Sequence, residues 1–164
     1  MTDPLTIRFA TARDVSLVHR LIHGLAEYER LAGEAVVTEA DVRASLFGEK
    51  PDAEVLIAEL DGAAAGFALF FHNYSTFLGR RGLYLEDLFV VPEYRGRGIG
   101  RALMARLARL ALERNCGRFE WWVLDWNEPA IRFYRSLGAR AMDEWTVYRL
   151  AGEPLARLAG EWPE

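Results

Sequence analysis

The chain has 164 residues, 51% of them hydrophobic, so one core can bury roughly 70% of the surface that the unfolded chain exposes. A single domain spanning residues 1–164 is therefore expected. Twenty basic residues against twenty-four acidic residues give a net charge of −4. This balance argues against a nucleic-acid-binding protein, which favours a basic face.

The start of the chain and its single cysteine indicate the compartment. Met1-Thr2-Asp3-Pro4 lacks the basic and apolar regions of a signal peptide, and no apolar run approaches the ~20 residues of a membrane helix. Cys116 is the single cysteine, which permits no internal disulfide, as is usual in the reducing cytoplasm. We expect a soluble, cytoplasmic protein with no membrane contact.

The first half of the chain shows both strand and helix periodicity. Residues 5–9 alternate apolar and polar side chains, as a strand does. Thr11 and Asp14 form a capping pattern before apolar residues that recur at helical spacing over 15–25. A second capping pattern opens a shorter helix over 38–48. Strands are predicted over 54–60 and 63–72, joined by a tight Asp-Gly turn.

The second half alternates strands and helices after a polar loop over 73–82. Predicted in order are a strand over 83–91, a helix over 99–114, a strand over 119–124, a helix over 127–137 and a last strand over 145–150. The order β-α-α-β-β-β-α-β-α-β predicts an α/β fold whose mixed sheet has helices on both faces. The tail over 153–164 has two apolar side chains, Leu155 and Leu158. These side chains can pack either on the same chain or on a partner subunit.

A glycine-rich loop, Arg95-Gly96-Arg97-Gly98-Ile99-Gly100-Arg101, joins the strand over 83–91 to the next helix. Glycines allow close approach of the backbone to a ligand. The unpaired N–H groups and positive dipole of the helix start favour a pyrophosphate. A Walker loop needs Lys-Ser/Thr after its last glycine, but here Gly100 is followed by Arg101. A dinucleotide fingerprint needs glycine at position 101 or 103, where Arg101 and Leu103 stand. Both kinds of nucleotide-binding loop are therefore excluded.

The pattern Arg95-x-x-Gly98-x-Gly100 resembles the acyl-CoA pyrophosphate loop of the GNAT N-acetyltransferase superfamily. Residues 127–139 resemble the superfamily's second signature, in which Asn127 is a suitable helix N-cap and Gly138 a left-handed stop. The two segments are separated by one helix and one strand. A glycine-rich turn that is purely structural is the alternative reading of the first motif.

Three further segments, 25–29, 83–90 and 126–129, are similar to the diamine (spermidine/spermine) and thialysine N-acetyltransferase branch. The similarity runs from residue 7 to about residue 159. The resemblance implies the GNAT acyl-CoA N-acyltransferase fold, acetyl-CoA as co-substrate without a metal, a small-molecule primary amine as acceptor, and a homodimer.

Acetyl transfer requires an amine that has lost its proton, donors for an oxyanion, and a proton for the departing thiolate. Glu86 interrupts an otherwise apolar strand, and the resemblance implies that it binds and deprotonates the amine. A solvent-facing edge carboxylate is the alternative. Tyr134 is implied to protonate the sulfur, and ordinary packing of this tyrosine on the sheet is the alternative.

The resemblance also implies where CoA binds. A backbone N–H near Phe89 and Val90 is expected to meet the acetyl carbonyl, Asn127 to bond the pantetheine arm, and the glycine loop to hold the pyrophosphate. The expected cofactor-binding residues are Phe89, Val90, Arg95, Gly96, Arg97, Gly98, Ile99, Gly100, Arg101, Asn127 and Tyr134.

Four residues are expected to bind the acceptor, namely Tyr28, Glu29, Glu86 and Asp87. In a regular strand Asp87 faces away from Glu86, whereas a β-bulge would change this. Polyamine enzymes of the branch have an aspartate after Tyr74 where this chain has Ser75, which favours a lysine-like acceptor. A polyamine, a protein amino group and a non-catalytic CoA-binding module are the alternatives.

Two other patterns are set aside. His19 and His23 have the i,i+4 spacing of metal ligands on a helix, but no adjacent glutamate or third ligand is evident, so no metal is expected. Cys116 lacks flanking residues that would activate a thiol.

Overall fold

The computed structural model describes residues 5–163. The chain divides into two compact units, residues 1–124 and residues 125–164, and the expectation of one domain stays a prediction. In chain order the elements are β1 (Thr6–Phe9), η1 (Ala12–Asp14), α1 (Val15–Tyr28), η2 (Ala32–Glu34), α2 (Glu39–Phe47), β2 (Glu54–Leu60), β3 (Ala63–Ser75), β4 (Arg80–Val90), η3 (Pro92–Tyr94), α3 (Ile99–Glu113), β5 (Phe119–Trp121), α4 (Glu128–Ser136) and α5 (Gly152–Ala159).

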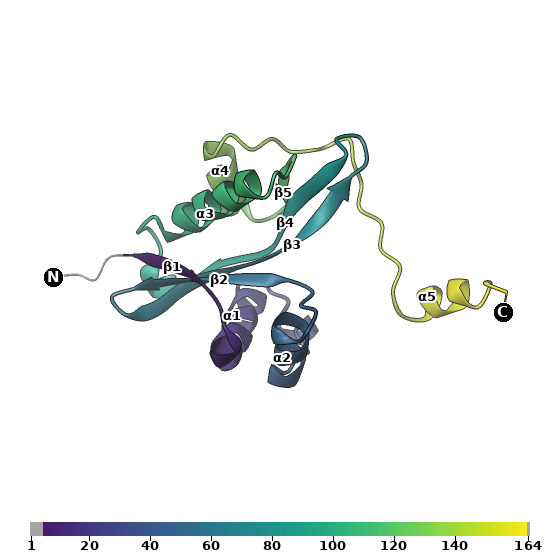
Figure 1. The fold of residues 1–164 in the computed structure, drawn as a ribbon, viewed down its shortest axis with the longest axis horizontal. Coiled ribbons are helices and arrows are strands. Elements are labelled where there is room, and N and C mark those ends of the chain that lie inside the picture. The colour runs from purple at the N-terminus through teal and green to yellow at the C-terminus, as the bar shows by residue number, and fades with distance from the viewer. Residues whose placement is uncertain (1–4, 164) are drawn as a thin grey trace. The chain divides into compact units, whose positions relative to one another are not determined.

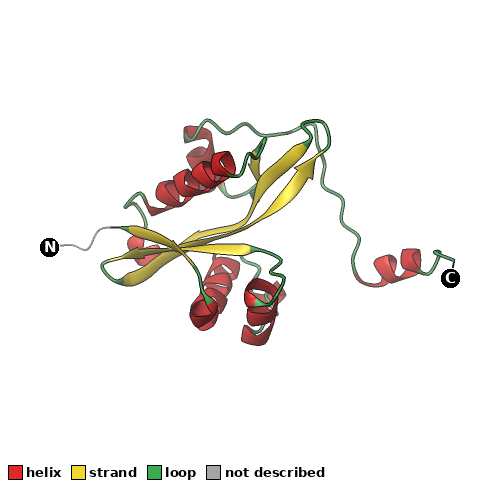
Figure 2. Ribbon diagram, viewed as in Figure 1, coloured by secondary structure: helices red, strands yellow, loops and turns green. Residues whose placement is uncertain are grey.

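The first unit is built on a five-stranded sheet in the order β1-β2-β3-β4-β5. The first three pairings are antiparallel and β4 pairs with β5 in parallel. Helices α1 and α2 cover one face of this sheet and α3 covers the other (Figure 1, Figure 2). The expected α/β class with a mixed sheet is confirmed.

The core of the first unit follows from the periodicities of its elements. α1 buries Val15, Val18, Leu21 and Leu25, a spacing of three to four residues that forms one apolar stripe. On this side of the sheet they form a cluster with Val42, Val55, Ile57, Phe67 and Phe89. On α3 the buried residues are Ile99, Leu103, Met104, Leu107, Leu110 and Ala111.

A partly buried ion pair lies at the start of α1. Asp14 closes a capping box with Thr11, and its carboxylate accepts hydrogen bonds from Arg8 Nη1 at 2.8 Å and Arg8 Nη2 at 2.9 Å. Arg8 also donates from Nη2 to Glu59 Oε1 at 2.9 Å. The Arg8 hydrogen bonds hold the pKa of Asp14 at about 2, below its usual 3.8. The Arg8 side chain thereby connects β1 with β2 and with the start of α1.

Replacing Asp14 with alanine is expected to reduce the free energy of unfolding by about 2 kcal/mol, because it removes one of the two carboxylates that Arg8 contacts and the capping box of η1, the turn that leads into α1. Since the pKa of Asp14 is depressed, its contribution is complete above pH 3.8 and is lost as the pH falls through about 2. Urea unfolding at neutral pH measures the loss. Asp41→Ala, which removes a similar but exposed capping box in α2, is the matched control. Equal losses in both variants would contradict the role of Arg8.

Three sequence predictions need correction. The polar loop is shorter than expected, because residues 73–75 and 80–82 pair with each other and extend β3 and β4. β5 ends at Trp121 instead of residue 124. No strand forms over 145–150: a strand needs a neighbouring backbone to complete its hydrogen bonds, and within the described part of the second unit no other strand is present.

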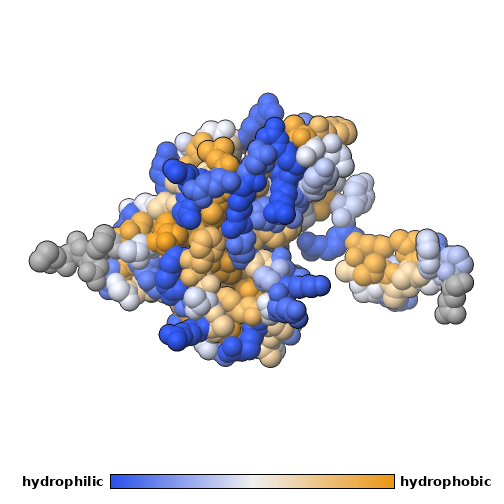
Figure 3. All heavy atoms as spheres, viewed as in Figure 1, coloured by the Kyte–Doolittle hydropathy of each residue, from blue (hydrophilic) through white to orange (hydrophobic). Residues whose placement is uncertain are grey.

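The second unit instead contains α4, a stretch without regular structure, and α5, which was not predicted. α5 buries none of its residues, and its apolar side chains gather visibly on the surface (Figure 3). Trp145 and Tyr148 are 74% and 93% exposed. In residues 5–163 no helix has the length and apolar character needed to cross a membrane.

Candidate active site

A β-bulge in β4 lies at the position predicted to hold the catalytic carboxylate. Leu85 pairs with Phe70 and Asp87 pairs with Leu69, so the pairing register shifts and Glu86 is the extra residue. Asp87 faces the α1 side, because it lines a hollow together with α1 residues. Glu86 is exposed, while Asp87 is half-buried. The bulge therefore separates these two carboxylates by environment.

Helix α1 approaches β4 closely at Gly24. A Cβ atom at this position would lie 3.0 Å from the ring of Phe89, so a larger residue would require that ring to shift. One turn further along, the helix ends at Tyr28 and Glu29 is its C-cap. This close approach brings the end of α1 beside the bulge.

The end of α1, η2 and β4 enclose a small acidic hollow of about 140 Å³. Three carboxylates line it, those of Glu29, Glu34 and Asp87. The remaining lining residues are apolar: Ile22, Leu25, Ala26, Leu31 and Ala35. The lining contains no basic side chain, so the hollow suits a ligand that carries positive charge.

The pKa values of Asp87 and Glu29 are raised by burial and by neighbouring negative charges. Burial raises the pKa of Asp87 to about 7, and the negative charges of Glu86 and Glu29 contribute to this increase. Burial also raises the pKa of Glu29, again with a contribution from Glu86. A cation relieves the repulsion among the carboxylates of Glu29, Glu86 and Asp87. The arrangement therefore favours an ammonium group and provides a proton acceptor whose pKa lies close to neutrality.

An aromatic wall accompanies the carboxylates on this side of β4. The ring of Tyr84 lies 5.0 Å from that of Phe71 and 5.9 Å from that of Trp122. Burial, followed by the charges of Glu86 and Glu120, raises the pKa of Tyr84 to about 12. Tyr84 therefore stays neutral at physiological pH, which makes it a packing residue and not a second base.

The glycine loop has the conformation expected of an anion-binding helix start. Gly96 and Gly98 have φ values of 75° and 78°, in the left-handed region that disfavours other residues. Gly98 is the N-cap of α3 and has no side chain to cap it, so the first-turn N–H groups of the helix remain without an intrahelical acceptor. The loop is exposed. These features fit a pyrophosphate.

Arg95 has a second role beside the one predicted. Its guanidinium lies 4.7 Å from the ring centre of Tyr28 and 5.7 Å from that of Phe89, and its Nε donates to Val90 O at 3.0 Å. Arg95 thus connects the glycine loop to the end of α1. Val91 N–H donates to Ala65 O at 2.9 Å, so it is already engaged within the sheet.

Two predicted residues, Asn127 and Tyr134, belong to the second unit. Asn127 is only 6% exposed, and its Oδ1 accepts a weak 3.4 Å hydrogen bond from Ala130 N, as an N-cap does. Tyr134 lies within α4, with its ring 5.4 Å from that of Phe133. The expected N-cap and helix are confirmed, and the roles of both residues toward CoA stay predictions.

Ser75 has a structural task. It is buried, and its Oγ accepts a hydrogen bond from Leu78 N at 3.3 Å in the turn between β3 and β4. Glu34, by contrast, was not identified from the sequence although it lines the acidic hollow. The sequence shows only that Glu34 follows Glu29 by five residues. Because the backbone conformation of this segment was not predictable, its position at the hollow was not predictable either.

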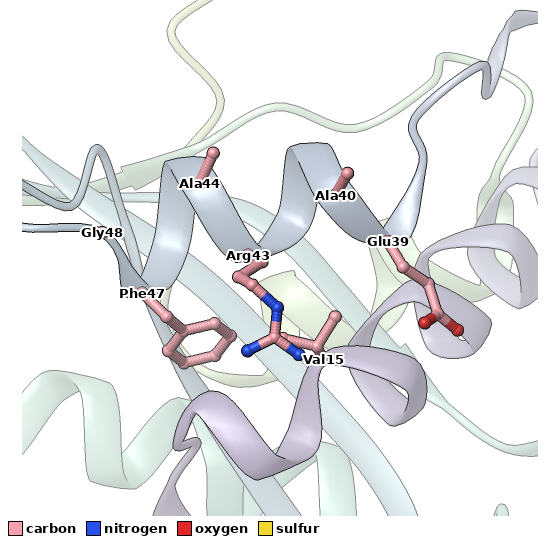
Figure 4. Close-up of a pocket in the computed structure, with 7 residues that line it drawn as sticks. All are labelled: Val15, Glu39, Ala40, Arg43, Ala44, Phe47 and Gly48. Carbon is pink, nitrogen blue, oxygen red and sulfur yellow. The ribbon is translucent and has the colours of Figure 1, made fainter.

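A larger hollow of about 490 Å³ lies along α2. In Figure 4 the side chains of Arg43 and Phe47 extend toward Val15. None of the predicted site residues lines it. Val15 and Tyr28 are at opposite ends of α1, about 20 Å apart, so this hollow is separate from the acidic one.

The chain is similar to known proteins in sequence and in fold. The acetyltransferase (GNAT) family matches residues 22–139. The thialysine N-epsilon-acetyltransferase of Sus scrofa is 40% identical, over 94% of this chain and 97% of that protein. The L-ornithine N5-acetyltransferase of Arabidopsis thaliana is 34% identical, over 93% of this chain and 86% of that protein. A solved integron cassette protein from the mobile metagenome of V. cholerae has a TM-score of 0.79 at 31% identity, covering 94% of this chain and 97% of that one.

Proposed function

Because the chain belongs to the acetyltransferase (GNAT) family and is an N-acetyltransferase, we propose that its acceptor is a lysine-like amino acid such as thialysine. The observation that carries the proposal is the acidic hollow formed by Glu29, Glu34 and Asp87 beside the bulge at Glu86. Relatives that act on thialysine and on L-ornithine support it. Both of these acceptors are small and carry more than one amino group.

The proposed reaction is direct transfer. The carboxylates of Glu86 and Asp87 take the proton from the acceptor ammonium, and the free amine nitrogen attacks the thioester carbonyl carbon. Backbone N–H groups near Phe89 and Val90 stabilise the oxyanion. The C–S bond then breaks, and Tyr134 donates a proton to the departing thiolate. The nitrogen gives up its second proton to solvent, and solvent returns a proton to the Tyr134 oxygen.

The binding of acetyl-CoA is assigned to the glycine loop and Asn127. The first-turn N–H groups of α3 and the side chains of Arg97 and Arg101 hold the pyrophosphate. Arg95 contributes by keeping the loop against Tyr28, where its guanidinium lies over the ring. Asn127 bonds the pantetheine arm.

A polyamine is the second candidate acceptor. The third carboxylate of the hollow, that of Glu34, also suits a longer chain with several positive charges. Ser75 supports the amino acid instead, because it occupies the position of the polyamine-reading aspartate and its side chain is engaged in the turn.

Replacing Glu29 with glutamine tests the acidic hollow. The KM for the acceptor should rise by roughly tenfold, because a charge that attracts the ammonium is removed, while the KM for acetyl-CoA and kcat stay within about twofold. Initial-rate measurements with each substrate varied give both constants. Glu27→Gln, at an exposed position of the same helix, is the matched control. An unchanged acceptor KM in the Glu29 variant would remove Glu29 from the acceptor site.

We further propose a cytoplasmic homodimer. The free Cys116 supports a reducing compartment. The second unit exposes large apolar side chains, Met142, Trp145, Val147, Tyr148, Leu150, Leu155, Leu158 and Trp162, and such surface is typical of an interface. Light scattering of the purified protein should give twice the chain mass of 18.6 kDa. A concentration-independent mass of one chain would contradict the dimer.

A further inference from the structure

Three polar atoms meet on the outer side of α1, away from the residues assigned to acetyl transfer. His19 Nε2 lies 3.0 Å from Val37 O, His23 Nε2 lies 3.1 Å from His19 Nε2, and His23 Nε2 lies 3.4 Å from Val37 O. Both imidazoles are half-buried. Each atom is thus in close contact with the other two.

When the imidazoles are neutral, hydrogen bonding satisfies this triangle in only one arrangement of the hydrogens. If His19 Nε2 carries the hydrogen, that hydrogen is shared between Val37 O and His23 Nε2, which lie 3.4 Å apart. If His23 Nε2 carries it, His19 Nε2 and Val37 O are two acceptors 3.0 Å apart. If both nitrogens carry hydrogens, two donors face each other across 3.1 Å. Two of the three arrangements therefore leave a repulsive contact, and the first divides a single hydrogen between two acceptors.

A metal ion satisfies all three contacts together. Ligands held at about 2.0–2.1 Å from Zn²⁺ in a tetrahedron are separated by about 3.3 Å, and the three edges observed here are 3.0, 3.1 and 3.4 Å. We propose that His19 Nε2, His23 Nε2 and Val37 O form a binding site for a late first-row divalent cation such as Zn²⁺. The remaining coordination position is left for water.

The ligand set explains why the site was dismissed from the sequence. In the described residues no group of three or more His, Cys, Asp or Glu side chains is placed to hold a metal, because the third ligand here is a main-chain carbonyl. Two imidazoles select zinc, copper or nickel over magnesium or calcium. The i,i+4 spacing places both rings on one face of α1.

The position of the site gives it a structural role. The histidines belong to α1, whereas Val37 lies in the segment that leads from η2 to α2. A bound ion would fasten this segment to α1. Glu34 and Ala35 of the same segment line the acidic hollow, together with Ile22 and Leu25 of α1. The ion would therefore stabilise two walls of that hollow without touching the reacting groups.

Calorimetric titration of the chelator-stripped full chain with ZnCl₂ tests the site. One ion per chain is expected, with a Kd of about 10 µM. At a hundredfold excess over Kd, Tm should rise by roughly 5–10 °C. His19→Gln and His23→Gln should each weaken binding at least tenfold and abolish the rise in Tm.

Two control variants locate the ion. His72→Gln removes the third histidine of the chain, and Cys116→Ser removes the only thiol, and both should bind zinc as the wild type does. If His19→Gln fails to fold, the comparison of His23→Gln with His72→Gln decides alone. Equal zinc affinity in the wild type and His23→Gln, or no binding to the wild type at 1 mM zinc, would overturn the proposal.

Discussion

Replacing Asp87 with asparagine is expected to lower kcat/KM for the acceptor by roughly 10²-fold and to remove the inflection of its pH profile near pH 7. The pKa of Asp87 is raised to about 7 by burial and by the charges of Glu86 and Glu29. In the wild type, kcat/KM should fall as the pH decreases through this value, because protonated Asp87 neither attracts the ammonium nor accepts its proton. The full pH profile of kcat/KM measures both effects.

The same substitution is expected to stabilise the protein. A carboxyl group whose pKa is higher in the folded state than its usual 3.8 favours folding while it is protonated. This contribution is lost as the pH rises through about 7. Asparagine carries no charge to bury, so Asp87→Asn should raise Tm by a few degrees near pH 8, an effect on the order of 2 kcal/mol. Near pH 4 the two proteins should be much closer in Tm.

Glu86→Gln and Glu113→Gln complete this comparison. Glu86→Gln should also reduce turnover by roughly 10²-fold, but it should leave an inflection in the pH profile, shifted downward because one neighbouring negative charge is gone. Glu113→Gln, at the exposed end of α3, is the control and should retain wild-type rates. An unchanged pH profile in Asp87→Asn would show that Asp87 is not the titrating group, and unchanged kcat in Glu86→Gln would exclude Glu86 as a base.

Replacing Tyr134 with phenylalanine is expected to lower kcat by roughly 10²-fold, because the thiolate of CoA then departs without a positioned proton donor. The KM for acetyl-CoA should change little, since the ring and its packing against Phe133 are retained. Steady-state kinetics with acetyl-CoA varied at saturating acceptor separates the two constants. Binding of CoA, measured by calorimetry, should stay within about threefold of the wild type.

Tyr74→Phe provides the matched control, because this tyrosine is 61% exposed and has no assigned role in transfer. It should retain wild-type kcat. If Tyr134→Phe also retains wild-type kcat, proton donation to sulfur by Tyr134 is excluded. A loss of CoA binding equal to the loss in rate would instead indicate a binding role.

Much of the first unit was predictable because its signals are local. The signals are the capping boxes at Thr11 and Thr38, the apolar run of β2 and the Asp61-Gly62 turn. All depend on residues close in sequence, and each element formed as expected. The glycine loop was equally clear, since left-handed backbone at Gly96 and Gly98 is a property of glycine itself.

The features that were not predictable depend on pairing across the chain. The bulge at Glu86 arises from the register of β3 against β4, and no single strand reveals it. The same register extended both strands through residues 73–75 and 80–82. Residues 145–150 alternate as a strand does, but periodicity cannot supply the neighbouring strand that such a segment needs. The sequence did not predict the roles of Glu34 and the carbonyl of Val37, because their positions depend on how the η2 segment folds onto α1.

The most direct test of the account is the rate of CoA release from acetyl-CoA with thialysine, L-lysine, L-ornithine, spermidine and an N-terminal peptide as acceptors. The acidic hollow and the role of Ser75 predict that kcat/KM for thialysine or another lysine-like amino acid exceeds that for spermidine by at least about tenfold. A preference for spermidine, or for the peptide, would contradict the proposed acceptor. The former would assign the recognition of a second nitrogen to another carboxylate of the chain, such as Glu34.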